Sequence, residues 1–234
     1  MTISTPALQA ALRQITDLPL VFGCVADGVV AGAGTSPTEH RPNVTGISSR
    51  HPAEGMARLL KQCVPGLRAV GTLFSPGEVN AEHNRKLFAA ALEQEGLKLI
   101  AMPVNSSTET VEATTALLRS DIQIICQVMD NTTRPAFSQI AKRADEAGLA
   151  FFCFDSSALR DGATLALARD FYDTGSETAA LAVRILHGEA PQGIPLTNAR
   201  TEVLMVNPEL LKKRGLVLPP EYAAKAQTVQ TKDP

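Results

Sequence analysis

Residues 69–78 read AVGTLFSPGE, an apolar run that passes directly into a polar turn. A helical pattern follows from Glu78 to Glu95, with apolar residues on one face and Gly96 as its C-cap. A second apolar run, Lys98–Val104, comes next. A strand, a helix and a strand in this order are typical of a βαβ unit, in which the two strands lie parallel in one sheet.

The same alternation recurs along most of the chain and predicts an α/β fold built on parallel sheets. Further helical patterns run from Pro135 to Gly148 and from Phe171 to His187. The predicted strands are Leu20–Ala26, Ala69–Phe74, Lys98–Val104, Ile122–Val128, Leu149–Phe154, Thr164–Ala168 and Glu202–Val206. Glycines and prolines break the stretch from Asp27 to Pro42, which we interpret as a crossing between two lobes. We interpret Pro191–Pro195 as a hinge or linker and Gln227–Pro234 as a frayed tail.

Composition argues against several classes of function. Hydrophobic residues make up 44% of the 234 residues and charged residues 20%, close to the averages for globular proteins. Lys and Arg number 22 against 24 Asp and Glu, and no basic run stands out, so we expect no nucleic-acid partner. No apolar run approaches the roughly 20 residues of a membrane helix, so we expect no membrane span.

Polar residues stand at the carboxyl ends of the predicted strands. In an open parallel sheet this edge binds ligands, because loops converge there and helix N-termini point toward it. The residues are Asp27, Ser75, Asn105, Asp130, Asn131, Asp155, Arg169 and Asp170. The alternative is that each short polar side chain only caps the helix that follows it. We favour capping at any single position and a polar cleft for the set as a whole.

The chain lacks the common catalytic and phosphate-binding motifs. Its four histidines have no partners at i,i+3 or i,i+4, so we expect no metal site, and we expect no cofactor. Its four cysteines are widely separated in the sequence, and we expect them to be buried free thiols. A thiol enzyme using Cys24 or Cys153 is a minor hypothesis, because both lie in or beside strand ends. We therefore predict a binding protein rather than an enzyme.

Several motifs, taken in order, resemble one protein family. They are Leu18–Phe22, Asn43–Ser48, Ser75–Asn80, Asp130–Thr132, Gly162–Ala163, Asp170–Gly175 and the ending from Val206 to Pro220. From about Thr5 to Ala226 the chain resembles the ABC-transporter substrate-binding proteins of the tryptophan/tyrosine-type group. The resemblance implies a type I periplasmic-binding-protein fold. In that fold two doubly wound parallel-sheet lobes, joined at a hinge by three crossings, close over a small ligand.

The resemblance also implies a ligand class and a set of ligand-binding residues. In the cleft wall of the second lobe these are Ser75, Glu78, Asn80, Asp130, Asn131 and Asp155, and the strand-end residues Asp27 and Asp170 join the predicted site. Aromatic amino acids and related small metabolites are the implied ligands. An ammonium group suits Asp130 or Glu78, and a carboxylate suits helix N-terminal amides and hydroxyls. Ala81 stands where relatives often carry serine, which leaves the ligand open.

The front of the chain departs from the family pattern. Relatives carry a signal peptide and about three strand–helix units before the segment that matches Thr5–Gln9, and residues 1–17 show no export signal. We therefore expect an N-terminally truncated chain with an incomplete first lobe. The expected division is a remnant of the first lobe at 1–43, a complete second lobe at 44–162, a return to the first lobe at 163–190, and hinge crossings, a final strand and a C-terminal helix at 191–234.

An incomplete lobe would leave buried positions exposed. Uncovering about ten apolar side chains costs roughly 15–30 kcal/mol, against a typical net stability of about 5–15 kcal/mol. We therefore expect a missing segment or a partner to complete the first lobe. The resemblance further implies an ABC permease as partner and a periplasmic or extracytoplasmic location. The alternatives are a cytoplasmic small-molecule-sensing module of the same fold, since no export signal is present, and a truncated receptor without function.

Overall fold

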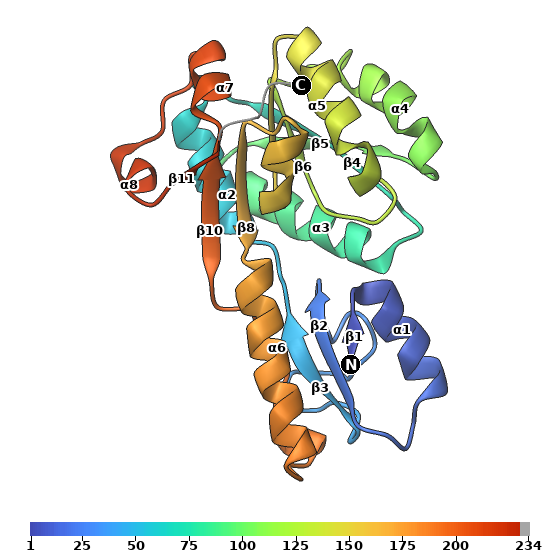
Figure 1. Ribbon diagram of the computed structural model, residues 1–234. Coiled ribbons are helices and arrows are strands. Elements are labelled where there is room, and N and C mark those ends of the chain that lie inside the picture. The colour runs from blue at the N-terminus through green and yellow to red at the C-terminus, as the bar shows by residue number, and fades with distance from the viewer. Residues whose placement is uncertain (230–234) are drawn as a thin grey trace. The chain divides into compact units, whose positions relative to one another are not determined.

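Two parallel-rich sheets organise the chain, as the alternation of apolar runs and helical patterns predicts (Figure 1). The computed structural model describes residues 1–229. These residues form two units: unit 1 holds Met1–His51 and Arg169–Thr201, and unit 2 holds Pro52–Ala168 and the chain from Glu202 onward. Each unit has its own sheet and its own core.

Unit 1 is a parallel sheet covered by a helix on each face. Its strands, in order across the sheet, are β1 (Thr2–Ile3), β2 (Leu20–Val25), β3 (Val44–Ser48) and β9 (Thr197–Asn198), and its helices are α1 (Thr5–Gln14), α6 (Phe171–Leu186) and the short η4 (Pro191–Gly193). Leu8 of α1 packs in one core with Phe22, whereas Leu181 of α6 packs in another with Val21. Successive strand residues point to opposite faces, so α1 and α6 cover opposite faces of the sheet.

Unit 2 is a larger sheet with helices on both faces. Among the described residues its strands, in order across the sheet, are β11 (Gln227–Thr228), β10 (Glu202–Val206), β8 (Leu165–Arg169), β7 (Ala150–Cys153), β6 (Ile124–Gln127), β4 (Ala69–Phe74) and β5 (Lys98–Pro103). The helices are α2 (Ala53–Cys63), α3 (Val79–Gln94), η1 (Ser107–Glu109), α4 (Thr110–Leu117), η2 (Arg134–Ala136), α5 (Phe137–Glu146), η3 (Ser156–Asp161), α7 (Pro208–Lys213) and α8 (Pro220–Ala223). The pairs from β5 through β8 are parallel, and so is β10 with β11.

Both faces of the unit 2 sheet are buried. Ile124 of β6 packs in one core with Phe88 of α3, and the next residue, Ile125, packs in the other core with Phe137 of α5. A central parallel strand that is covered on both faces is apolar at nearly every position. This explains why the run from Ile122 to Val128 shows no polar–apolar alternation.

The structure contains every predicted strand, with ends shifted by at most two residues, and adds β1, β3, β9 and β11. Three of these additional strands have only two residues each, which is too short to give a recognisable hydrophobic pattern in the sequence. The longer one, β3, changes the predicted organisation because it pairs in parallel with β2. The stretch from Asp27 to Pro42 therefore connects two strands of unit 1 and is no crossing between lobes. The chain first passes to unit 2 after His51, later than the predicted boundary at Asn43.

Two smaller expectations also change. Pro191–Gly193 forms η4, and Ile194 is buried in the core of unit 1, so this segment is packed rather than a free linker. The predicted frayed tail begins with β11, which pairs with Met205 and Val206 of β10. Residues 230–234 of that tail lie outside the described residues. Within residues 1–229 no helix combines the length and the hydrophobicity needed to cross a membrane.

A glycine in β3 allows the close pairing of β3 with β2. A Cβ atom at Gly46 would overlap the ring and the carbonyl oxygen of Phe22. We predict that Gly46→Ala lowers the free energy of unfolding by about 1–3 kcal/mol, because the buried Phe22 ring cannot move aside without strain. Urea denaturation followed by circular dichroism measures this loss.

Gly193→Ala is the matched control in the same unit. No atom lies within 4 Å of the Cβ position at Gly193. Its free energy of unfolding should therefore stay within about 0.5 kcal/mol of the parent protein. Equal midpoints for the two variants would show that the packing of Gly46 against Phe22 is not limiting.

Candidate functional site

Six of the predicted site residues lie at one edge of the unit 2 sheet. Ser75 follows β4, Glu78 and Asn80 start α3, Asp130 and Asn131 follow β6, and Asp155 follows β7. The strands β4, β6 and β7 are parallel neighbours, so their carboxyl ends meet at this edge. The structure therefore brings together the six residues named from unit 2. The other two predicted residues, Asp27 and Asp170, belong to unit 1.

A buried side-chain amide holds this edge together where β4 and β6 stop pairing. Their backbone pairing is recorded at Val70–Ile124 and Gly71–Ile125. Beyond it, Gln127 Nε2 donates to the carbonyl oxygen of Leu73 at 2.7 Å, and Gln127 Oε1 accepts from the Leu73 N–H at 3.0 Å. The Gln127 amide thus satisfies both backbone groups of Leu73. Sequence reasoning missed this residue, and its signal was an amide, one of two with Gln123, inside an otherwise apolar predicted strand.

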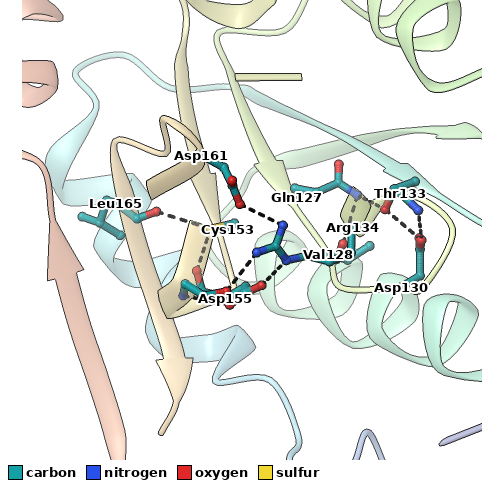
Figure 2. A network of polar contacts seen from close by, with 10 residues as sticks. Gln127, Val128, Asp130, Thr133, Arg134, Cys153, Asp155, Asp161 and Leu165 are labelled. Atoms are coloured by element: carbon teal, nitrogen blue, oxygen red, sulfur yellow. Dashed lines mark hydrogen bonds and ion pairs between the residues drawn. The ribbon is translucent and has the colours of Figure 1, made fainter. Parts of the chain in front are cut away.

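Asp130 joins the loop after β6 to the end of β4, and Figure 2 shows its contact with Thr133 in that loop. Its Oδ1 accepts from the N–H and the hydroxyl of Thr133 at 2.6 and 2.8 Å, and its Oδ2 accepts from the Ser75 N–H at 3.1 Å. The Thr133 hydroxyl in turn accepts from Gln127 Nε2 at 3.2 Å. Burial raises the pKa of Asp130 and the nearby charge of Glu78 adds to this, while the hydrogen bonds from Thr133 and Ser75 oppose it.

Glu78 fixes the next two residues of the same loop. Its two carboxylate oxygens accept from the N–H and side-chain amide of Asn131 at 2.9 and 2.6 Å, and from the N–H and hydroxyl of Thr132 at 2.8 and 2.7 Å. Asn80 Nδ2 donates a fifth bond at 3.1 Å. Burial alone would raise the pKa of Glu78, but the hydrogen bonds from Thr132, Asn131 and Asn80 outweigh it and lower the pKa. A carboxylate offers about four lone-pair sites, so Glu78 has no capacity left to accept further hydrogen bonds.

Asp155 is the centre of a second polar group at this edge. Its side chain caps η3 by accepting from the Ser157 N–H at 2.9 Å, as the capping interpretation predicts. Arg134 Nε donates to Asp155, and Arg134 Nη1 lies 2.9 Å from Asp161 Oδ2 (Figure 2). Burial would lower the pKa of Arg134, but the charges of Asp155 and Asp161 raise it. No sequence signal distinguished Arg134, which lies beyond the end of the strand.

The two predicted residues of unit 1 have local roles. Asp27 Oδ1 accepts from the N–H groups of Val29 and Val30 at 2.9 and 3.1 Å, and Asp27 also pairs with Arg50. Asp170 caps α6 by accepting from the Asp173 N–H at 2.8 Å. Asp170 agrees with the capping interpretation, whereas Asp27 holds a turn between β2 and β3 and caps no helix.

Some polar groups at the unit 2 edge keep free hydrogen-bonding capacity. The Ser75 hydroxyl makes no hydrogen bond to any described residue, although its backbone N–H is held by Asp130. Helix α3 starts at Val79, and the N–H groups of a first helical turn have no partner within the helix. A hydroxyl beside a helix N-terminus is an arrangement that binds an anionic group such as a carboxylate.

The thiols are poorly suited to nucleophilic chemistry. Burial raises the pKa of Cys24 and Cys153, and it raises the pKa of Cys63 to about 11. Cys153 is fully buried, and its Sγ donates to the carbonyl oxygen of Asp155 at 3.3 Å. A reactive thiol needs a lowered pKa, so the geometry gives the thiol-enzyme hypothesis no support. Among residues 1–229 no three histidine, cysteine, aspartate or glutamate side chains group to hold a metal ion.

Comparison with known proteins decides the family. The family model described as ABC transporter substrate binding protein matches residues 1–230. The chain belongs to this family. The family assignment made from the sequence is thereby confirmed, and with it the class of binding protein rather than enzyme.

Individual relatives agree with the family. A curated tyrosine-binding protein of Clostridioides difficile is 24% identical over 210 residues, which is 90% of this chain. The chain spans 61% of the length of that relative. A conserved domain protein from Vibrio cholerae is 28% identical with a TM-score of 0.89, and the match covers 98% of this chain and 77% of that one.

A solved structure with a ligand is also similar. The ABC domain from Streptococcus pneumoniae in complex with L-Trp is 25% identical with a TM-score of 0.90, over 97% of this chain and 78% of that one. The fold is α/β and type I periplasmic-binding-protein-like, as predicted.

The contribution of the Gln127 amide can be tested by measuring the free energy of unfolding. We predict that Gln127→Leu lowers the free energy of unfolding by about 1–3 kcal/mol, because the buried N–H of Leu73 loses its partner, whereas the carbonyl oxygen of Leu73 keeps the hydroxyl of Thr72 at 3.2 Å. The control is Gln123→Leu, which removes a similar bridge to Arg68, Ala69 and Gly66 at a half-buried site near the surface. Water replaces that bridge, so urea denaturation should show a loss below about 1 kcal/mol. Equal losses would contradict the role of burial.

The contribution of the Glu78 carboxylate can be tested by measuring stability as a function of pH. We predict that Glu78→Gln destabilises the protein by about 1.5–3 kcal/mol at pH 7, because an amide NH₂ would then face N–H and O–H donors. The folded-state pKa of Glu78 is lowered, so its stabilisation is complete above the ordinary pKa of glutamate and is lost as the pH falls through the folded-state value.

Thermal unfolding of the parent protein and of Glu78→Gln should therefore converge under acidic conditions. Glu93→Gln, at an exposed position on the same helix, is the control and should have little effect at any pH. A stability difference between the parent and Glu78→Gln that does not depend on pH would refute the assignment.

Proposed function

We propose that the protein is the solute-binding component of an ABC importer and that it binds an α-amino acid, with aromatic amino acids preferred. The observation that carries the proposal is the similarity to the L-Trp complex from Streptococcus pneumoniae, which extends over 97% of this chain. The curated relative from Clostridioides difficile is named a tyrosine-binding protein, which supports the same ligand class.

The free polar groups of unit 2 support a position for the ligand carboxylate. We infer that the carboxylate accepts hydrogen bonds from the Ser75 hydroxyl and from the first-turn N–H groups of α3. Backbone donors and a helix dipole favour negative charge without placing a cationic side chain in the site. The role of Glu78 is then to hold Asn131 and Thr132 in place beside this position rather than to contact the ligand itself.

The number of hydrogen bonds that each carboxylate already accepts indicates which one pairs with the ligand ammonium. Glu78 already accepts five hydrogen bonds, whereas Asp130 accepts three and keeps acceptor capacity. We therefore infer that Asp130 is the carboxylate for the ammonium group. Asn80, Asn131 and Asp155 complete the proposed set in unit 2. Participation of Asp27 and Asp170, in a cleft shared by two lobes, stays a prediction.

The transport role carries two further proposals. A solute-binding component delivers its ligand to a permease, so an ABC permease is the proposed protein partner. An extracytoplasmic location is proposed with it, because family members capture solutes outside the cytoplasm. The cytoplasmic sensor and the non-functional receptor stay alternatives.

Calorimetric titration with the twenty amino acids tests the proposed function. We predict that L-tryptophan or L-tyrosine binds with a dissociation constant below about 1 mM, which corresponds to more than roughly 4 kcal/mol. Ser75→Ala should weaken binding about tenfold by removing one hydrogen bond to a charged group. Ser138→Ala, at an exposed position in the same unit, should leave affinity unchanged. Absence of binding by every amino acid would overturn the proposal.

A further inference from the structure

A chain of hydrogen bonds leads from the interior of the unit 2 sheet to Asp130. Gln127 Nε2 donates to the Thr133 hydroxyl at 3.2 Å, and this hydroxyl donates to Asp130 Oδ1 at 2.8 Å (Figure 2). The Thr133 N–H donates to the same oxygen at 2.6 Å. Gln127 and Thr133 are fully buried, so water does not compete for these bonds. Asp130 Oδ1 is therefore held by two donors of one residue.

The orientation of the Gln127 amide fixes the direction of this chain. Gln127 Oε1 accepts from the Leu73 N–H and Nε2 donates to the Leu73 carbonyl oxygen, so a flipped amide would oppose like groups at both positions. Because Nε2 carries only donors, the Thr133 oxygen must accept from it. The single hydrogen of the Thr133 hydroxyl then remains for Asp130.

The two oxygens of Asp130 differ in what they can still accept. Oδ1 accepts from both donors of Thr133, whereas Oδ2 accepts from the Ser75 N–H at 3.1 Å alone among the described residues. A carboxylate oxygen has two lone pairs, so Oδ2 keeps one of them. The bond from Ser75 places Oδ2 beside the residue whose hydroxyl is the proposed partner of the ligand carboxylate. An α-amino acid carries both charged groups on one carbon atom, so their partners must be neighbours.

Asp155 shows the same pattern with a different charge balance. Its Oδ1 accepts from the N–H and the hydroxyl of Ser157 at 2.9 and 2.6 Å, but its Oδ2 pairs with the guanidinium of Arg134. Within residues 1–229 no lysine, arginine or histidine side chain forms an ion pair with Asp130. The charge of Asp155 is therefore balanced inside the protein, whereas that of Asp130 can be balanced by a ligand.

We propose that Thr133 is a positioning residue that selects ligands with an ammonium group, because it engages Asp130 Oδ1 and so turns Oδ2 toward that ammonium. The inference rests on the proposed function, in which Asp130 receives the ligand ammonium. Thr133 is fully buried, so it acts through Asp130 rather than on the ligand. The terminal torsion of an aspartate has a broad energy profile, so without the hydroxyl the carboxylate has no strong preference of its own for this orientation.

Calorimetric titration of the full chain with L-tryptophan and L-tyrosine tests this role. Thr133→Val keeps the size, the β-branch and the N–H of the residue and removes the hydroxyl, and it should weaken binding about tenfold. Thr133→Ser restores the hydroxyl and should recover the affinity of the parent protein. Thr114→Val is the matched control, because it removes an equally buried threonine hydroxyl that donates to Thr110 in α4, and its affinity should equal that of the parent.

Ligands without the ammonium group separate this role from a general loss of packing. Indole-3-propionate and 3-(4-hydroxyphenyl)propionate have the ring and the carboxylate of tryptophan and tyrosine but no ammonium. Thr133→Val should therefore bind each of them as the parent does. Circular dichroism melting shows that each variant is folded before affinities are compared, and we expect Thr133→Val to fold because Gln127 keeps its bonds to Leu73.

The outcomes distinguish this inference from the proposed function. A parent protein that binds no amino acid would refute the proposed function and this inference with it. A parent that binds its amino acid and a Thr133→Val variant that binds it equally well would overturn this inference alone. An equal loss for the ligand without the ammonium, or an equal loss in Thr114→Val, would also overturn it. A selective loss in Thr133→Val that Thr133→Ser restores supports it.

Discussion

The hydrogen bonds of the Gln127 amide to Leu73 are the interaction on which the unit 2 edge depends. Parallel strands that separate leave N–H and C=O groups unpaired, and in a buried position water cannot replace the missing partners. One side chain with a donor and an acceptor satisfies both groups at once. The strands can therefore diverge at their carboxyl ends without an energetic penalty, and the loops that follow them gain room for polar residues.

Two carboxylates then hold the loop that follows β6 in place. Asp130 ties its start to β4, and Glu78 ties its next residues to the start of α3. Their environments shift the pKa values in opposite directions: burial dominates at Asp130, whereas donated hydrogen bonds dominate at Glu78. Side chains that the sequence predicts to bind a ligand thus use much of their hydrogen-bonding capacity within the protein itself. The groups that remain available are a serine hydroxyl, backbone amides and the remaining acceptor capacity of Asp130.

The sequence predicted the architecture well because both sheets are built from apolar runs that alternate with helices. It did not predict β3, since Val44–Ser48 contains a glycine and two hydroxyl residues, and its pairing with β2 depends on the fit of Gly46 under Phe22. At the candidate site, strand-end position identified Asp130, and the family resemblance implied Glu78. The ion pair of Arg134 with Asp155 was not predictable, because it depends on how far the loop after β6 reaches toward β7.

The division of the chain has a consequence for the order in which it folds during synthesis. Unit 1 is assembled from two segments, 1–51 and 169–201, and the strand β9 that completes its sheet comes from the second. Most of unit 2 lies between them as one continuous stretch. On the ribosome, β1 to β3 emerge before most of unit 2 but must wait for α6 to cover one face of their sheet. The early part of unit 1 is therefore the stretch in greatest need of chaperone protection, because the helix that covers its sheet is made only after most of unit 2.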